Sequence, residues 1–232
     1  YASKDELKPA MTGVYVHQNG KMETCATDGH VMRLMEDASL GLNLKLKGSF
    51  KGVIPIKALM VLSKSVKGSV PVMATDKHMK FNLNGIDFFV RLIDEKYPDF
   101  RSVIPEEFMG SVLLDTAKLS DLVKDAKPFV FGDSKQGNFD IGSAGVDLHV
   151  NNPEKEIQWD ASLVALNQSG SEIKIGLNVH YLEKILKGIT EKELTWEYSS
   201  PVSASILKGQ NEESQITHLI MPVRIKETSH GE

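Results

Sequence analysis

The stretch Phe81-Asn82-Leu83-Asn84-Gly85-Ile86-Asp87-Phe88 decides the class of fold. Apolar and polar residues alternate on both sides of Asn84-Gly85, and Asn-Gly is the pair that two-residue hairpin turns favour. The same arrangement occurs earlier, where Val14-x-Val16 and Met22-x-Thr24 flank Asn19-Gly20. Two tight β-hairpins are therefore predicted, and antiparallel strands are expected to dominate the fold.

Three amphipathic helices are predicted among these strands, each with a recognisable start. They cover about 56–66 after Pro55, 116–126 after a capping Asp115, and 179–187 after a capping Asn178 and before Gly188. Further strand-rich stretches are expected at 138–150, 156–166, 194–198 and 202–207. The predicted fold class is α+β with antiparallel sheets.

The length of 232 residues, of which 41% are hydrophobic and 25% charged, is ordinary for a globular chain with two cores. A proline and two acids in Pro105-Glu106-Glu107-Phe108-Met109-Gly110 indicate a boundary. The predicted domains are therefore residues 1–106 and 107–232. Both contain strands, then a helix, then more strands, which suggests a duplicated architecture.

Composition narrows the class of protein further. No apolar run approaches the ~20 residues of a membrane helix, and the N-terminus lacks a signal-peptide pattern, so a cytoplasmic location without membrane attachment is expected. Cys25 is the only cysteine and is read as a small buried hydrophobe in a reducing compartment. No cofactor is expected.

The net charge of −4 argues against a broad grip on nucleic acid, which depends on basic residues that release counterions. The charge does not exclude weaker contacts between a mildly basic surface and a duplex. The lysines with spacings that suit exposed helical faces are Lys57, Lys64, Lys67, Lys118, Lys124 and Lys127.

Two Asp-x-His pairs, Asp28/His30 and Asp76/His78, raise the alternative of a metal-dependent hydrolase. No third ligand follows at a metal-binding spacing, so no metal site is predicted, and Gly29 indicates a turn in which Asp28 accepts backbone amides. Phosphate-binding glycine loops, nucleophile elbows and zincin helices are absent from the sequence. A binding protein without catalytic residues is favoured over an enzyme.

The segment Leu219-Ile220-Met221-Pro222-Val223-Arg224-Ile225 is apolar apart from its arginine, and resembles neither an ordinary strand nor a solvated tail. With six other segments it resembles, over nearly the whole chain, the middle and C-terminal domains of the bacterial beta sliding clamp, the beta subunit of DNA polymerase III. The other matching segments are 7–14, 26–30, 53–55, 92–105, 175–182 and 200–202.

The resemblance implies the DNA-clamp fold, in which two similar domains place antiparallel sheets outside and helices inside a ring around double-stranded DNA. The middle domain would lack its first strand and helix, which favours a fragment of a three-domain clamp that forms a dimeric ring. A natural two-domain clamp would need a trimer. A clamp-derived interaction module that closes no ring is a further alternative, and a bacterial, nucleoid-associated location is implied.

In this family a hydrophobic groove binds short peptides of the replicative polymerase, the clamp loader and repair polymerases. The resemblance carries that groove onto Thr27, Gly29, His30, Val31, Met32, Pro98, Val103, Asn178, Tyr181, Pro201, Leu219, Ile220, Met221, Pro222, Val223 and Arg224. It also implicates Phe129, Val130 and Phe131 in a subunit interface.

Two positions depart from the family pattern. Val31 stands where arginine is common, and Ala10 stands where some members have an aromatic residue. A different peptide preference is therefore expected. The polar tail 226–232 extends beyond the family's usual end and is predicted to be disordered.

Overall fold

A computed structural model describes residues 1–19, 21–37, 49–66, 68, 70–152, 155–210 and 216–225. The chain divides into two compact units, unit 1 (Tyr1–Phe100) and unit 2 (Arg101–Glu232). The boundary predicted from the sequence lies a few residues further along. Gly20 of the first predicted turn, Lys67 and the tail 226–232 fall outside the described residues.

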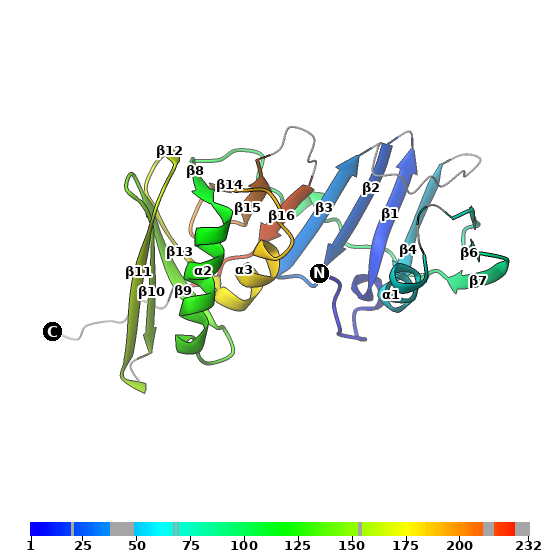
Figure 1. The fold of residues 1–232 in the computed structure, drawn as a ribbon, viewed down its shortest axis with the longest axis horizontal. Coiled ribbons are helices and arrows are strands. Elements are labelled where there is room, and N and C mark those ends of the chain that lie inside the picture. Colours follow the sequence, from blue (N-terminus) through cyan, green and yellow to red (C-terminus); the bar gives the residue numbers. More distant parts are fainter. Residues whose placement is uncertain are drawn as a thin grey trace. The chain divides into compact units, whose positions relative to one another are not determined.

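Unit 1 has one α-helix and one short 3₁₀ helix among strands in its described part (Figure 1). Its elements are a 3₁₀ helix, η1 (Pro9–Thr12), then β1 (Gly13–Asn19), β2 (Lys21–Thr27), β3 (Val31–Asp37), β4 (Phe50–Pro55), α1 (Ile56–Ser65), β5 (Val72–Ala74), β6 (His78–Leu83) and β7 (Ile86–Arg91).

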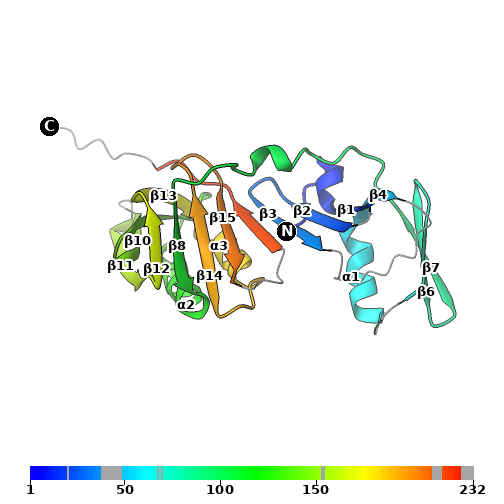
Figure 2. The ribbon, with the colours of Figure 1, turned by 90° about the horizontal axis from the view of Figure 1, so that it is seen from above.

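The strands of unit 1 form two antiparallel sheets. One has the order β3-β2-β1-β4, and the other has the order β5-β6-β7. The β6–β7 turn is as predicted, since Asn84 and Gly85 have φ angles of 53° and 92°, the positive values that a type I′ turn requires. Figure 2 shows β6 and β7 beyond β4 and α1. A shared core joins the two sheets and α1, and it includes Ile54, Leu62, Met79, Phe81 and Val90.

Unit 2 has two α-helices and two short 3₁₀ helices among strands in its described part (Figure 1). Its elements are η2 (Arg101–Val103), β8 (Gly110–Asp115), α2 (Thr116–Ala126), η3 (Lys127–Phe129), β9 (Gln136–Gly142), β10 (Gly145–Asn152), β11 (Ile157–Val164), β12 (Asn167–Gly170), β13 (Ile173–Asn178), α3 (Val179–Leu186), β14 (Glu193–Tyr198), β15 (Ser205–Gly209) and β16 (Ile216–Ile220).

These strands form two antiparallel sheets, in the orders β11-β10-β9-β13 and β12-β8-β14-β15-β16. Helices α2 and α3 pack against each other; α2 also contacts β8 and β11, while α3 contacts β13 and β16. Large side chains fill the core: the rings of Phe139 and Trp196, both 0% exposed, meet edge to face with centroids 5.4 Å apart.

Unit 2 contains the same order of elements twice: a strand, a helix and three strands. The first copy is β8-α2-β9-β10-β11, and the second, which follows β12, is β13-α3-β14-β15-β16. Unit 1 shows the same order once, in β4-α1-β5-β6-β7, preceded by β1, β2 and β3. In unit 2, the first strand of each copy pairs with a strand of the other copy: β13 pairs with β9, and β8 pairs with β14. The predicted α+β class with antiparallel sheets is confirmed.

The predicted helices begin and end within a residue of α1, α2 and α3. Two strand predictions need correction. The stretch 202–207 was expected to be a strand, but Ser200 to Ser203 form a turn in which the Ser203 amide donates to the Ser200 carbonyl oxygen over 3.3 Å, so β15 begins only at Ser205. Leu219 and Ile220 are ordinary strand residues of β16, and only the part from Met221 onward is irregular. Within the described ranges, no helix is both long enough and apolar enough to cross a bilayer.

Candidate functional site

The turn between β2 and β3 is held by side-chain caps. The Asp28 carboxylate accepts the amides of His30 and Val31, each over 3.0 Å. The Thr27 hydroxyl donates to the Val31 carbonyl oxygen over 2.8 Å and accepts the Gly29 amide over 3.0 Å. Gly29 has a φ angle of 92°, which favours glycine. Asp28 therefore has the predicted structural role of accepting backbone amides in a turn. The turn leaves Gly29 and His30 exposed.

Pro98 is positioned by its neighbours in unit 1. The Tyr97 hydroxyl donates to the Cys25 carbonyl oxygen over 3.2 Å, and the Tyr15 ring lies 5.3 Å from Tyr97 and 5.5 Å from Phe100, between centroids. Burial raises the pKa of the Tyr97 hydroxyl, so it remains a hydrogen-bond donor at neutral pH. These buried rings fix the segment on β1 and β2 and leave Pro98 exposed between them.

In unit 2, the segment 221–225 leaves β16 and lies against β13. The Val223 amide donates to the Gly176 carbonyl oxygen over 2.7 Å. A Cβ atom at Gly176 would lie 2.5 Å from the Val223 carbonyl oxygen, so only glycine allows this close approach. Met221, Pro222 and Val223 are half-buried and Arg224 is exposed. The segment therefore presents apolar surface while its backbone is held on β13.

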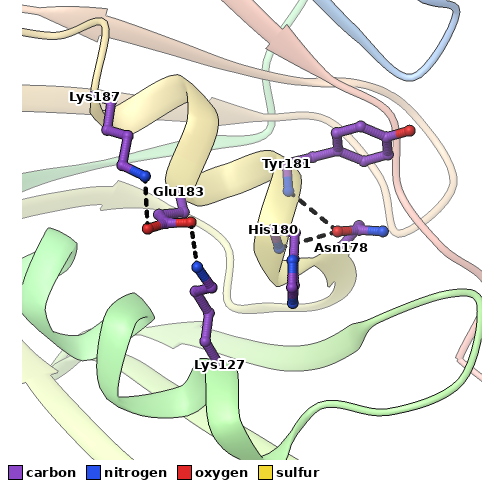
Figure 3. Close-up of polar contacts among 6 residues, drawn as sticks. All are labelled: Lys127, Asn178, His180, Tyr181, Glu183 and Lys187. Carbon is purple, nitrogen blue, oxygen red and sulfur yellow. Dashed lines mark hydrogen bonds and ion pairs between the residues drawn. The ribbon is translucent and has the colours of Figure 1, made fainter.

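The first turn of α3 adds two of the predicted residues. The Asn178 side chain accepts the amides of His180 and Tyr181 over 3.0 and 3.1 Å, which caps the helix (Figure 3). Tyr181 is half-buried, and its ring points away from Glu183 and Lys127 (Figure 3). Because α3 packs against β16 and β13, the cap fixes Tyr181 on the helix that contacts the strand preceding the 221–225 segment.

The predicted groove residues differ widely in exposure. Gly29, His30, Pro98, Val103, Pro201 and Arg224 are exposed, Asn178, Tyr181, Met221, Pro222 and Val223 are half-buried, and Thr27, Val31, Met32, Leu219 and Ile220 are buried. Those from Thr27 to Pro98 belong to unit 1 and the others to unit 2. Buried members can shape a binding surface, but a ligand reaches only the exposed and half-buried ones.

Gly176 positions a segment of the candidate site, and the sequence analysis did not single it out. Its signal is a glycine inside the strand pattern Ile173-Lys174-Ile175-Gly176-Leu177, which marks a bulge or a close backbone approach. The pattern alone does not reveal which segment approaches.

The hydrolase alternative has no support in the structure. The Asp28 carboxylate is bonded to backbone amides, and the backbone amide of His78 donates to the Thr75 hydroxyl over 3.1 Å in a separate surface turn. Across the described ranges, no three His, Cys, Asp or Glu side chains are grouped so as to hold a metal ion.

Sequence comparison agrees with this division of the chain. The family model of the DNA polymerase III beta subunit, C-terminal domain, matches residues 101–224, and the model of its central domain matches residues 1–99. The chain belongs to the DNA polymerase III beta subunit family. The resemblance predicted from the motifs is thus confirmed.

Curated relatives named beta sliding clamp are similar along the chain. The Bacillus subtilis relative is 25% identical and the Treponema pallidum relative 29%, each over 96% of this chain. Among solved structures, the beta subunit of Streptococcus pyogenes DNA polymerase is 27% identical with a TM-score of 0.89, and the match covers 97% of this chain and 61% of that one. The chain spans about three fifths of these relatives' length, 59% and 60% of the two curated proteins.

Proposed function

We propose that the chain is part of a non-catalytic DNA sliding clamp, which surrounds double-stranded DNA and tethers the replicative polymerase and other factors to it. The observation that carries the proposal is the match of both family models, in order, to the two compact units. The names of the relatives agree with it. A cytoplasmic, nucleoid-associated location follows from this function.

The helices supply the surface that would face DNA. Lys57 and Lys64 on α1 are exposed, as are Lys118 and Lys124 on α2. Their exposure supports the prediction that lysines on helical faces form a mildly basic lining. A clamp that is held topologically needs no stronger grip, because weak backbone contacts allow it to slide.

We propose further that the exposed and half-buried residues of the candidate site bind the peptides of partner proteins. Met221, Pro222 and Val223 offer apolar side chains, and Tyr181 adds a ring with a polar end. Each large side chain of a peptide that is buried there would gain roughly 1.5–3 kcal/mol. Micromolar affinity, about −8 kcal/mol, is then expected after ordering costs.

Val31 bears on which peptides are preferred. Val31 is the first residue of β3 and is 0% exposed. By the resemblance described above, arginine is common at this position in the clamp family. A buried valine cannot supply the positive charge that would attract an acidic peptide residue. Preference for apolar rather than acidic flanking residues is therefore proposed.

Ring closure would require self-association, and η3 with β11 is the proposed subunit interface. Phe129 stacks on Trp159 with centroids 5.8 Å apart, and the Lys155 ammonium lies 3.8 Å from the Phe131 ring centroid. Val130 between them is only 4% exposed, so it supports this surface from the core. The aromatic rings remain half-buried and can be covered by another subunit.

Peptide titration tests the proposed function. A fluorescent peptide that ends in leucine and phenylalanine should bind saturably, and Met221→Ala or Pro222→Ala should weaken it. Met73→Ala is the matched control, because this exposed methionine lies on β5. The assignment fails if no saturable binding occurs or if Met73→Ala weakens it equally.

The remaining alternative is an interaction module that closes no ring. Mass measurement of the protein in solution, followed by its loading onto circular DNA, separates the two. A sliding clamp stays on closed circles and leaves when they are linearised. An interaction module gives peptide binding without this topological retention.

A further inference from the structure

Glu183 on α3 is bonded to two lysines at once. One carboxylate oxygen accepts the Lys127 ammonium over 2.7 Å, and the other accepts the Lys187 ammonium over 2.8 Å (Figure 3). The Glu183 side chain is 13% exposed, whereas those of Lys127 and Lys187 are 32% and 64% exposed. Hydrogen bonds from Lys127 and then Lys187 lower the pKa of Glu183, so the carboxylate is charged at neutral pH.

The two ion pairs connect elements as well as charges. Lys127 begins η3, directly after α2, so its pair with Glu183 ties the end of α2 to α3. Lys187 is the C-cap residue of α3 and follows Glu183 by one helical turn. The ammonium groups of both lysines are therefore bonded to the same carboxylate.

Another lysine of α2 is also paired with an acid. Lys124 pairs with Asp121 over 3.1 Å, and both are exposed. Exposed Asp125 lies beside Lys124 in the sequence of α2. Burial lowers the pKa of His180, and the charges of Lys127 and Lys135 lower it further, so this imidazole is neutral at pH 7.

Helix α1 differs, because Lys57 and Lys64 are exposed and its sequence, Ile56-Lys57-Ala58-Leu59-Met60-Val61-Leu62-Ser63-Lys64-Ser65, contains no acid. Pairing of lysines with acids is thus found at Lys124, Lys127 and Lys187 of the α2–α3 surface, whereas α1 has no acid of its own to pair with.

We propose that Glu183 limits how strongly the α2–α3 surface binds the DNA backbone, by holding Lys127 and Lys187 in ion pairs. The inference rests on the proposed function, in which the helices face the duplex. A lysine releases a counterion from DNA only when its ammonium is available to a phosphate. Glu183 makes that exchange unfavourable for two lysines, and so keeps the contact weak enough for sliding.

Removal of one charge tests this inference. Binding of a short fluorescent DNA duplex is measured by anisotropy over a range of salt concentrations for the wild type and Glu183→Gln, which keeps the shape of the side chain. We expect Glu183→Gln to bind several-fold more tightly at low salt. The slope of log K against log salt should become steeper by about 1–2, because one or two additional lysines reach phosphates.

Two further variants make the result specific. Glu197→Gln is the matched control, because Glu197 accepts a hydrogen bond from Lys208 over 2.9 Å on the β14–β15 sheet and not on the helices. It should bind like the wild type. In the triple variant Glu183→Gln, Lys127→Gln, Lys187→Gln, the gain should vanish. Thermal melting checks that each variant is folded.

The outcomes separate the inference from the proposed function. An unchanged affinity and slope in Glu183→Gln overturns the inference, as does an equal gain in Glu197→Gln or a gain that survives in the triple variant. In those cases the wild type still binds DNA and the sliding-clamp proposal stands. If neither the wild type nor any variant binds the short duplex at low salt, the inference fails, whereas the sliding-clamp proposal fails only if the protein is also not retained on circular DNA.

Discussion

The amide of Val223 donates to the carbonyl oxygen of Gly176 over 2.7 Å, which fixes the apolar C-terminal segment on β13. A methyl group at Gly176 would come within 2.5 Å of the Val223 carbonyl oxygen, a backbone atom that can move only with its segment. This contact holds the segment that contains Met221 and Pro222 against β13.

Gly176→Ala should therefore weaken peptide binding several-fold, because the segment 221–225 must shift away from β13. Fluorescence titration with the partner peptide measures the effect. Gly142→Ala is the control, since its added methyl group would meet the flexible Glu172 side chain at 3.0 Å. Equal peptide affinity in Gly176→Ala and the wild type would show that the position of the segment does not matter for binding.

The caps of α2 and α3 allow stability to be separated from binding. Asn178→Ala removes the acceptor of the His180 and Tyr181 amides, and Asp115→Ala removes the acceptor of the Lys118 amide. Each should lower the free energy of unfolding by about 1 kcal/mol, measured in urea. Only Asn178→Ala should also weaken the peptide, because it loosens the turn that carries Tyr181. Loss of peptide binding in both variants would contradict this assignment.

Local chemistry made much of the fold predictable. Asp115 and Asn178 determine where α2 and α3 begin through bonds to residues two or three positions later, and Asn84-Gly85 forms its turn without help from the rest of the chain. Short strands such as β5 and β12 carry little pattern of their own. They form because β6 and β8 provide edges to pair with, which no local window shows.

The candidate site was less accessible to prediction. Motif resemblance suggested its residues but gave no indication of their exposure: Val31 and Met32 are 0% and 1% exposed, whereas His30 beside them is exposed. That difference arises because the Asp28 turn ends and β3 enters the core at Val31. The role of Gly176 depends on Val223, a partner distant in sequence. The strand pattern therefore indicates a close backbone approach at Gly176 but does not indicate which segment approaches.

Acid should selectively weaken the contribution of Glu183 to stability. Its pKa is lowered in the folded protein, so the carboxylate stabilises the native state above the unfolded pKa, about 4.3, and this contribution is lost as pH falls through the folded pKa. Glu183→Gln should therefore unfold at lower urea concentration than the wild type at pH 7, and the two should converge on acidification. A difference that stays constant between neutral and strongly acidic pH would rule out the ion pairs as its source.

Cys25 should be protected from alkylation in the native protein. Burial raises the pKa of its thiol to about 12, the side chain is 0% exposed, and the thiolate is the reactive form. As the chain has one cysteine, mass spectrometry after treatment with iodoacetamide at pH 8 reports on this thiol alone. We expect slow labelling of the native protein, and labelling in urea at the rate of an ordinary cysteine, pKa about 8.5.

Tyr97→Phe provides a graded test, because it removes the hydroxyl that donates to the Cys25 carbonyl oxygen and so should increase labelling through local opening. Fast labelling of the native wild type would contradict the buried position of β2 in unit 1.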